Sequence, residues 1–178
     1  MAQTQKTLSE KDMFLQSFQR EIQTTIKLLK AYPAAKADMK PAEKSRSARE
    51  LAWVFATEQG VVDMALKGKI DFSQPSPPAP SNYNDIISGV EKASHDTVAK
   101  VSKLSDDQLN KTLSDDQLNK TIQFPIGPGK MGDFRVAEVL WMTVQDQIHH
   151  RGQFSVYLRL AGAKVPSIYG PTADETWM

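Results

Sequence analysis

Cysteine is absent from the 178-residue sequence, which excludes disulfides, thiolate nucleophiles and Cys-rich zinc sites. Long apolar runs are absent as well. The first residues, MAQTQKTLSEKDMF, lack the hydrophobic stretch of a signal peptide. No segment approaches the roughly 20 apolar residues that a membrane-spanning helix requires. We therefore expect a cytoplasmic protein with no membrane partner.

Neither sign of charge is in excess. The sequence has 22 basic and 21 acidic residues, for a net charge of +1. A protein that binds nucleic acid through its phosphates needs a basic excess on one surface, so we expect no nucleic-acid partner. The length, the 40% hydrophobic content and the 24% charged content are typical of one globular domain with a sizeable core. We treat residues 1–178 as a single domain.

Four segments carry hydrophobic residues at spacings of three and four, which is the pattern of amphipathic helices. They run from Ser9 to about Ala31, from Ser47 to about Lys67, from Ser81 or Asn82 through Val101, and from about Asp133 to about Ala161. Ser47 and Glu50 have the spacing of a capping box, while Pro33 and Gly162 are helix stops. The segments predict an all-α fold, a four-helix bundle with long connections.

Two connections are long enough to allow a helix order other than simple up-down-up-down. Four prolines between residues 75 and 80 exclude helix from the connection after the second segment. The connection after the third segment contains a tandem duplication over residues 104–121, in which LSDDQLNKT occurs twice. We interpret the duplication as a lengthened surface connection, and Phe124 to Gly132 as a turn-rich connection.

Asp146 and His150 are the first candidate site residues, on the fourth predicted helix. They are four residues apart and therefore lie on one face, one turn from each other. A carboxylate and an imidazole so placed can share a divalent ion such as zinc, nickel, iron or manganese. Such pairs are more often solvated surface residues. Val139, Thr143 and Tyr157 share this face, however, which indicates that it turns inward.

Glu58 is the third candidate, because it falls on the apolar stripe of the second predicted helix, between Phe55 and Val61. A carboxylate that faces a core is costly unless it is paired or bound to a metal. Two roles stay open for it: a metal ligand, or one half of an internal ion pair with Arg151 or another basic residue.

Two neighbours of these residues are interpreted differently. His149 points about 100° away from His150 around the helix, so we expect it to pack or to form a hydrogen bond outside the site. Gly152 stands in mid-helix, where glycine costs roughly 1 kcal/mol relative to alanine. Its presence indicates either close helix packing or access for a ligand.

Two runs of residues resemble motifs of the DinB-like (DinB/YfiT) family. HHRGQFSVYLRLAGAKVPSIYGPTADE, from His149 to Glu175, resembles the closing motif, and ELAWVFATE, from Glu50 to Glu58, resembles the second-helix motif. With SRSARELAW upstream and the same helix order, the resemblance spans nearly the whole chain. It implies a four-helix bundle that holds a divalent metal through three histidines, one from the second helix and two, four residues apart, from the last. It also implies a homodimer, because members are often dimeric and bacterial.

The family pattern is met only in part. His150, directly before Arg-Gly-Gln, matches the second histidine of the last helix. Asp146 stands where the family usually has the other histidine, and Val54, which cannot ligate, stands at the second-helix position. Glu58, one turn beyond Val54 on the same face, is the nearby replacement. The resemblance thus implies an altered, incomplete metal site of His150, Asp146 and Glu58, and it assigns no catalytic residue.

Two functions remain open. The first is a divalent-metal-dependent enzyme, a hydrolase or a thiol-dependent transferase that acts on a small molecule, in which metal activates water or polarises the substrate and Gln153 contacts a ligand or the substrate. The second is a metal-free, non-catalytic relative that binds a small molecule or a partner chain. The valine at position 54 favours the second function, and the acidic residues on inward faces favour the first. A thiol-dependent reaction needs an external thiol, since the chain has none.

Overall fold

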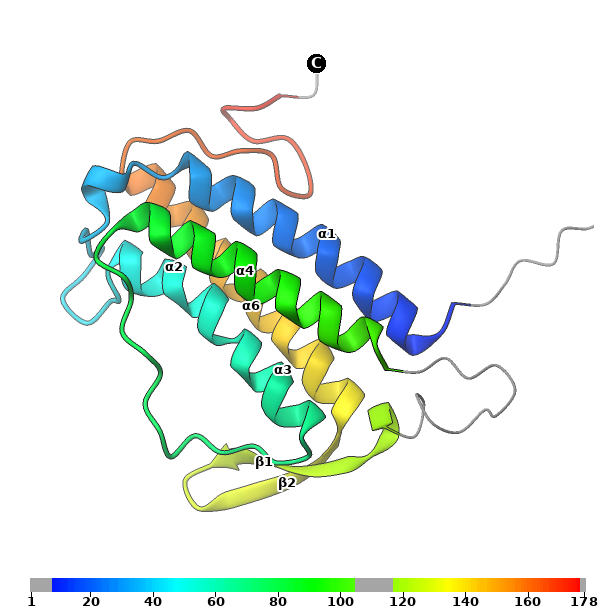
Figure 1. The fold of residues 1–178 in the computed structure, drawn as a ribbon. Coiled ribbons are helices and arrows are strands. Elements are labelled where there is room, and N and C mark those ends of the chain that lie inside the picture. Colours follow the sequence, from blue (N-terminus) through cyan, green and yellow to red (C-terminus); the bar gives the residue numbers. More distant parts are fainter. Residues whose placement is uncertain (1–7, 105–116, 177–178) are drawn as a thin grey trace, which may run out of the picture.

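The structure is a computed structural model that describes residues 8–104 and 117–176. The helices of the bundle are α1 (Glu10–Ala31), α2 (Ala48–Thr57), α3 (Gln59–Leu66), α4 (Tyr83–Ser102) and α6 (Val136–Leu160). A short 3-10 turn, η1 (Ala34–Lys36), follows α1, and two strands, β1 (Thr121–Gly127) and β2 (Lys130–Arg135), precede α6. The predicted all-α four-helix bundle is confirmed, with α2 and α3 together forming one of its four rods (Figure 1). None of the described helices is both long and apolar enough to cross a membrane.

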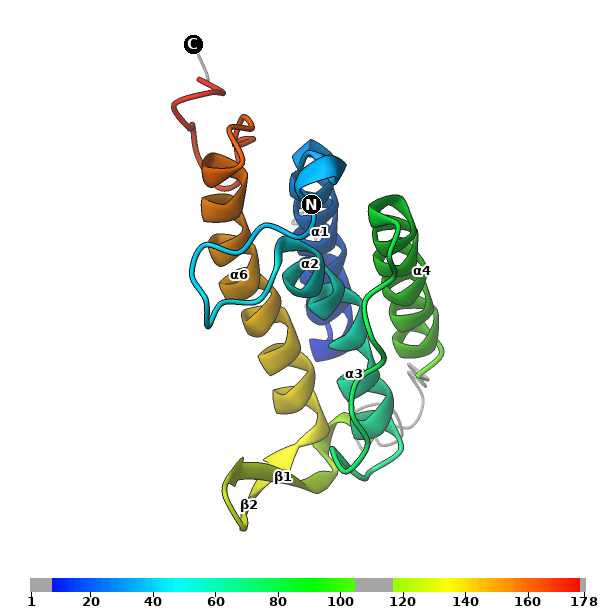
Figure 2. The same cartoon turned by 90° about the vertical axis from the view of Figure 1, so that its left-hand side faces the viewer.

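The order of the helices differs from a simple up-and-down bundle. α1 packs against α4 and α6, and the α2–α3 rod packs against the same two helices from the other side. α4 runs in the same direction as α2–α3, because residues 67–82 return along the whole length of the bundle before α4 begins (Figures 1 and 2). The long connection that we expected to permit another order does so.

The predicted helix boundaries are largely confirmed. Ser9 Oγ accepts a hydrogen bond from the Asp12 N–H at 3.1 Å and caps α1. Ser47 and Glu50 form the capping box, with Ser47 N–H donating to Glu50 Oε2 at 2.6 Å. Gly162 follows α6 with a φ of 71°, a left-handed conformation that glycine adopts without strain.

The second predicted helix is not continuous. α2 ends at Thr57 and α3 begins at Gln59, so the prediction of a single helix from Ser47 to Lys67 was wrong at Glu58. Glu58 itself keeps a helical backbone, with φ −57° and ψ −30°. The interruption lies two residues before Gly60, and glycine lowers helix stability. The interruption places Glu58 at the junction of α2 and α3, which faces α6.

The connection before α6 is a β-hairpin, and the prediction of a turn-rich connection from Phe124 to Gly132 missed its two strands. β1 and β2 pair antiparallel, with Thr121 opposite Arg135, and α6 accordingly begins at Val136 rather than Asp133. Phe124 and Phe134 meet edge-on at 5.8 Å between ring centroids, and this cross-strand contact outweighs the weak strand propensity of proline and glycine. Residues 105–116 of the tandem duplication lie outside the described residues.

The interior of the bundle is divided lengthwise into two apolar clusters. One contains the buried apolar residues of α1 from Ile22 to Leu29, of α2 from Leu51 to Ala56 and of α6 from Phe154 to Leu158. The other contains Phe14 and Phe18 of α1, Val62 and Ala65 of α3, and apolar residues from the first half of α6. On each rod, buried polar residues fall between the two sets: Glu21 on α1, Glu58 and Gln59 at the α2–α3 junction, Ser94 and Thr97 on α4, and Gln147 and Arg151 on α6. The bundle therefore has a polar middle layer, and the candidate site lies at its edge.

Candidate metal centre

Glu58 is buried, with 8% of its surface exposed. Both of its carboxylate oxygens are inaccessible, and no described residue directs a hydrogen-bond donor at either of them. Burial, reinforced by the neighbouring Asp146 carboxylate, raises the pKa of Glu58 to about 9, against a smaller opposing effect of Arg46. Without a cation, Glu58 is therefore a neutral acid at pH 7, whose O–H can donate to Asp146.

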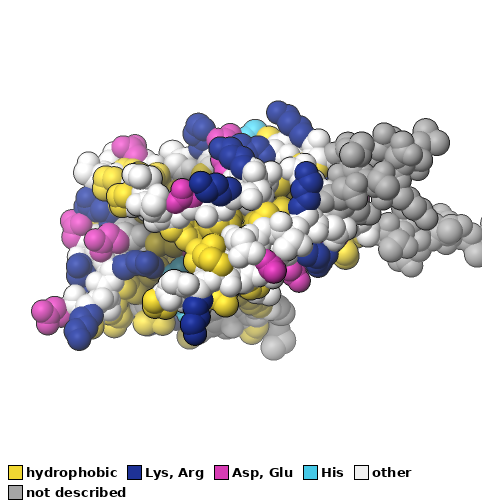
Figure 3. Space-filling model, turned by 90° about the horizontal axis from the view of Figure 1, so that it is seen from below, with side chains coloured by type: hydrophobic (Ala, Val, Ile, Leu, Met, Phe, Trp, Pro, Cys, Tyr) yellow, Lys and Arg dark blue, Asp and Glu magenta, His cyan; other side chains and the backbone are white. Residues whose placement is uncertain are grey.

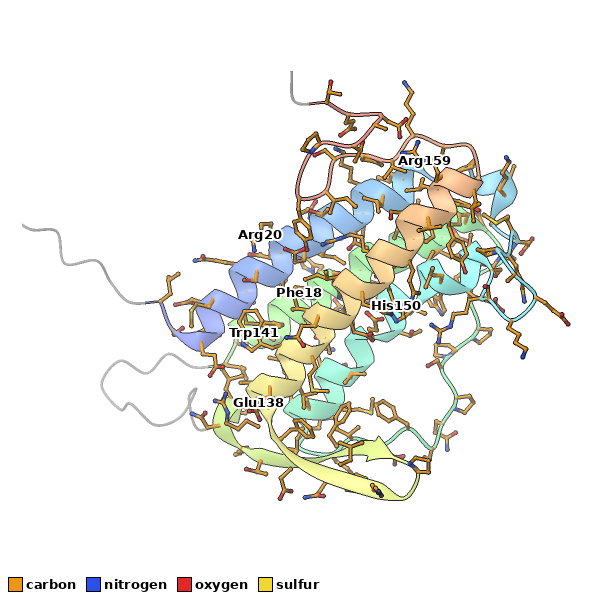
Figure 4. All side chains as sticks on the ribbon, turned by 180° about the vertical axis from the view of Figure 1, so that it is seen from behind. Phe18, Arg20, Glu138, Trp141, His150 and Arg159 are labelled. Carbon is orange, nitrogen blue, oxygen red and sulfur yellow. The ribbon has the colours of Figure 1, made fainter. Side chains whose placement is uncertain are left out.

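His150 and Asp146 complete a cluster with Glu58. His150 Nε2 lies 3.3 Å from Glu58 Oε1 and 3.6 Å from Asp146 Oδ1. One potential ligand atom from each of the three residues lies within 4.8 Å of the other two. His150 projects from α6 toward the α2–α3 rod (Figure 4), and the inward face that we predicted from Val139, Thr143 and Tyr157 is buried. The structure thus brings together all three candidates from the sequence.

Gln153 holds the imidazole of His150 from its other side. Gln153 Oε1 lies 3.3 Å from His150 Nδ1, and an amide oxygen can only accept, so this contact assigns the proton to Nδ1. In the neutral imidazole, the lone pair of Nε2 then faces Glu58 and Asp146, as metal ligation requires. Gln153 Nε2 also donates to His149 Nε2 at 2.8 Å, so one amide orients both histidines.

The donor set of the cluster is two carboxylates and one neutral imidazole. Carboxylate oxygens repel one another at such short range unless a proton or a cation lies between them. A divalent metal fits this chemistry, because imidazole and carboxylate are ordinary ligands of zinc, iron, nickel and manganese. Three protein ligands leave further coordination positions for water or substrate.

A cavity of about 1020 Å³ opens beside the cluster. Its walls are α2–α3 and α6, and it is bordered by residues 71–79 of the long connection and by Phe124 of the hairpin. Hydrophobic side chains gather in the middle of the molecule's underside, where the hairpin and this connection lie (Figure 3). Val54 lines the same cavity as Glu58, which agrees with their predicted common face.

Arg151 is not the partner of Glu58, so Arg151 was the wrong choice for the ion-pair alternative; the basic residue beside Glu58 is His150. Arg151 is 1% exposed and donates from Nη2 to Glu21 Oε2 of α1 at 2.6 Å. It also donates to the Tyr169 hydroxyl, which itself donates to Glu21 Oε2 at 2.6 Å. The sequence interpretation missed this triad. Glu21 falls next to Phe18 and Ile22 on the apolar stripe of α1, and this position was a signal for it.

Two further expectations about α6 are corrected. Gly152 is exposed, and apart from its chain neighbours and the backbone of its own helix, none of the described atoms lies within 4 Å of the position that a Cβ would occupy. Packing against another helix of the chain therefore does not require glycine there. His149 does form a hydrogen bond, as predicted, but it is exposed and lines the same cavity as His150. It does not belong to the cluster of three ligand candidates.

Known proteins resemble this chain both in sequence and in fold. A sequence model described as the DinB family matches residues 1–177. The protein YrdA of Bacillus subtilis, which is described as uncharacterized, is 28% identical over 166 residues, covering 92% of this chain and 90% of that protein. A DinB-like protein from Bacillus cereus superposes with a TM-score of 0.69 at 24% identity, covering 88% of this chain and 95% of that chain. YfiT from Bacillus subtilis, described as "a probable metal-dependent hydrolase with an unusual four-helix bundle topology", superposes with a TM-score of 0.60 at 11% identity, covering 92% and 95%.

Proposed function

This chain belongs to the DinB family, and from that premise we propose that it binds one divalent metal ion through Glu58, Asp146 and His150 and acts as a metal-dependent hydrolase on a small molecule. The observation that carries the proposal is the convergence of two carboxylates and His150 Nε2 within 4.8 Å. A divalent ion at this point lowers the pKa of a bound water and polarises a substrate oxygen. The description of YfiT as a probable metal-dependent hydrolase supports the same class of reaction.

Gln153, Glu58 and Asp146 have different roles in binding the metal. Gln153 keeps the Nδ1 proton of His150 in place and so keeps Nε2 free to ligate. The buried Glu58 carboxyl group, which is neutral without a cation, would release its proton to solvent when it ligates a metal. Asp146 is more exposed, with 53% of its side chain accessible. Its carboxylate can therefore change position when a substrate enters the cavity.

The donor set also favours certain metals. Imidazole nitrogen suits zinc and nickel, whereas carboxylate oxygen suits manganese. A site with one imidazole and two carboxylates therefore prefers manganese over zinc and nickel more than a three-histidine site does. This preference is relative, because zinc binds most sites of this type more tightly than manganese does.

A metal-free binding protein is the second candidate function. Val54 favours it, because the second-helix ligand position carries a side chain that cannot ligate. Glu58 can also stay buried as a neutral acid. In this case the cavity binds a small molecule without a metal.

Calorimetric titration separates the two functions. The protein is purified without a His-tag, stripped with chelator and titrated with Mn²⁺ and Zn²⁺. We expect one site per chain in the wild type and binding weakened at least about tenfold in Glu58→Gln, since one ligand is lost. Glu50→Gln is the matched control, because Glu50 lines the same cavity outside the cluster and glutamine also completes a capping box. Absence of binding in the wild type, or equal binding in Glu58→Gln, rejects the metal site and leaves the second candidate.

We also propose that the chain forms a homodimer through the exposed face of α6. Val156 and Leu160 are 55% and 57% exposed, and Gly152, one turn earlier, presents open space. Large apolar side chains on one exposed helix face are a common feature of subunit interfaces.

A further inference from the structure

The cavity is chemically different on the two sides of the cluster. Toward the end of α3 and the start of α6, most of its lining is apolar: Val61, Met64, Phe72, Phe124, Val139 and Met142. The one carboxylate among the described residues at this end is Asp71, next to Phe72 and Met64. Toward the start of α2, it is lined by Arg46, Glu50 and Trp53. Because α2–α3 and α6 run in opposite directions (Figure 1), these two groups lie on opposite sides of Glu58 along the bundle.

Arg46 is the one lysine or arginine among the described residues that line the cavity. Its guanidinium forms no ion pair with any carboxylate of residues 8–104 and 117–176. Arg46 lines the cavity together with Glu50 and Glu58, so it can offer its positive charge to a ligand bound there. An arginine at such a position recognises an oxyanion with its planar array of donors.

Glu50 limits how much negative charge this end of the cavity accepts. Its carboxylate receives the Ser47 N–H at 2.6 Å, and that hydrogen bond holds its pKa below the ordinary value. Glu50 therefore remains charged near Arg46. A ligand with one negative charge is compatible with this pair, whereas a dianionic phosphate is repelled by Glu50.

We propose that the cavity binds an amphipathic carboxylate, whose apolar part lies in the half between Met64, Phe72 and Met142 and whose carboxylate pairs with Arg46. The group that joins the two parts then faces the cluster of Glu58, Asp146 and His150. An N-acyl amino acid has this order of groups, with an acyl chain, an amide and a carboxylate. Any reaction at the amide, which faces the cluster, rests on the proposed function of a metal bound there. The recognition of the two ends does not.

The test compares N-octanoylglycine with two compounds that each lack one of its two recognised groups. N-octanoylglycine has both ends, N-octanoylglycinamide lacks the charge, and N-acetylglycine lacks the apolar chain. In calorimetric titrations of the full chain, we expect N-octanoylglycine to bind at least about tenfold more tightly than either of the others. Comparable affinity for all three, or no binding of N-octanoylglycine, overturns the proposal.

Variants identify which residue recognises each end. Arg46→Gln should abolish the preference for the acid over the amide and keep the preference for octanoyl over acetyl. Lys44→Gln is its matched control, because Lys44 is an exposed cation of the same loop that does not line the cavity. Phe72→Ala should reduce the preference for octanoyl and keep the preference for the acid. If Arg46→Gln behaves like Lys44→Gln, Arg46 does not bind the carboxylate and the proposal is wrong.

The same titrations with His150→Ala separate this inference from the metal site. If the wild type binds no metal but the preference for the acid persists in His150→Ala and disappears in Arg46→Gln, the proposed function fails and the carboxylate site stands. If the preference disappears in His150→Ala and persists in Arg46→Gln, the carboxylate binds at the cluster. That outcome overturns the assignment to Arg46 and leaves the metal site intact.

Discussion

His150 Nε2 lies 3.3 Å from Glu58 Oε1, and this contact joins the middle of α6 to the junction of α2 and α3. The junction is where the helical rod is interrupted, and the contact lies at the edge of the polar layer between the two apolar clusters. Sites built from side chains of facing helices are typical of bundle proteins. The tight packing on either side holds the two side chains at a fixed distance without a loop.

His150→Ala should abolish binding of Mn²⁺ and Zn²⁺, because it removes the one imidazole of the cluster. His149→Ala should change the dissociation constant less than about threefold, since His149 supplies no ligand atom to the cluster and contacts it through Gln153 and the ring of His150. Calorimetric titration of the two stripped variants provides the comparison. Equal loss in both variants contradicts the assignment of His150 as the ligand.

Metal affinity should depend steeply on pH. Burial and the Asp146 carboxylate raise the pKa of Glu58 to about 9, so a metal must displace its proton at any lower pH. The affinity attributable to Glu58 should therefore rise up to about tenfold for each pH unit between 6 and 8. Titrations of the wild type and Glu58→Gln over this range isolate the effect, because other protonations are common to both proteins. Parallel pH profiles would show that Glu58 does not ligate.

The sequence predicted the helices well because their signals are local. Capping residues such as Ser47 and Glu50 and the apolar repeat lie within a few turns of the elements that they define. The hairpin was missed because what stabilises it is the contact of Phe124 with Phe134 across the turn, while Pro125 and the glycines are unfavourable in strands. The break at Glu58 was missed because the apolar repeat continues through it.

The candidate site was predicted as a set of residues but not as a geometry. Helical spacing placed Asp146 next to His150, and the apolar stripe showed that Glu58 turns inward. The stripe could not show which buried charge pairs with which, since the choice depends on how three helices pack. Arg151 is adjacent to His150 in sequence, yet it forms an ion pair with Glu21 on α1. Glu58 lies instead with Asp146 and His150 in the cluster.

Arg151→Met should lower the free energy of unfolding by about 3–5 kcal/mol, because it leaves the buried Glu21 carboxylate without its partner. Arg20→Gln is the control. Arg20 also contacts Glu21, at 3.4 Å, but its side chain is 73% exposed, so its loss should cost less than about 1 kcal/mol. Urea unfolding at pH 7 measures both values. Similar costs for the two variants would mean that the buried pair is not a major source of stability.

The same pair should make the fold sensitive to acid. Burial by itself raises the pKa of Glu21, but hydrogen bonds from Tyr169 and Arg151 outweigh burial and hold the pKa below the ordinary value of 4.5. The stabilisation is therefore complete above the pKa of the unfolded chain and is lost as pH falls through the lower, folded value. Urea midpoints measured from pH 7 to pH 3 should fall less in Glu21→Gln than in the wild type. A steeper fall in the variant contradicts the sign of the shift.

Val156→Glu combined with Leu160→Glu should convert the proposed homodimer into a monomer of 19.8 kDa, because each buried carboxylate at an apolar interface is costly. Met131→Glu provides the control. Met131 is also an exposed apolar residue, at 49%, but it lies on the hairpin. Sedimentation at micromolar concentration distinguishes the species. A wild type that sediments only as a monomer removes the dimer proposal.

Val54→His should strengthen the binding of Zn²⁺ and Ni²⁺ more than that of Mn²⁺, because it adds an imidazole to the same cavity one turn from Glu58. Val54 is only partly buried, so the cavity has room for the larger ring. Any overpacking should cost roughly 1–3 kcal/mol of stability. Calorimetric titration and urea unfolding of the same preparation measure both effects.

Met64→His is the control for this gain, because Met64 lines the same cavity from α3, beyond the cluster. A histidine there adds an imidazole to the cavity without adding a ligand to the site, and it should leave the ratio of zinc to manganese affinity unchanged. If both histidine variants fold and bind zinc equally, the added affinity comes from an imidazole anywhere in the cavity. The metal would then not lie between α6 and the α2–α3 junction, and the contact of His150 with Glu58 would be an internal hydrogen-bonded pair instead.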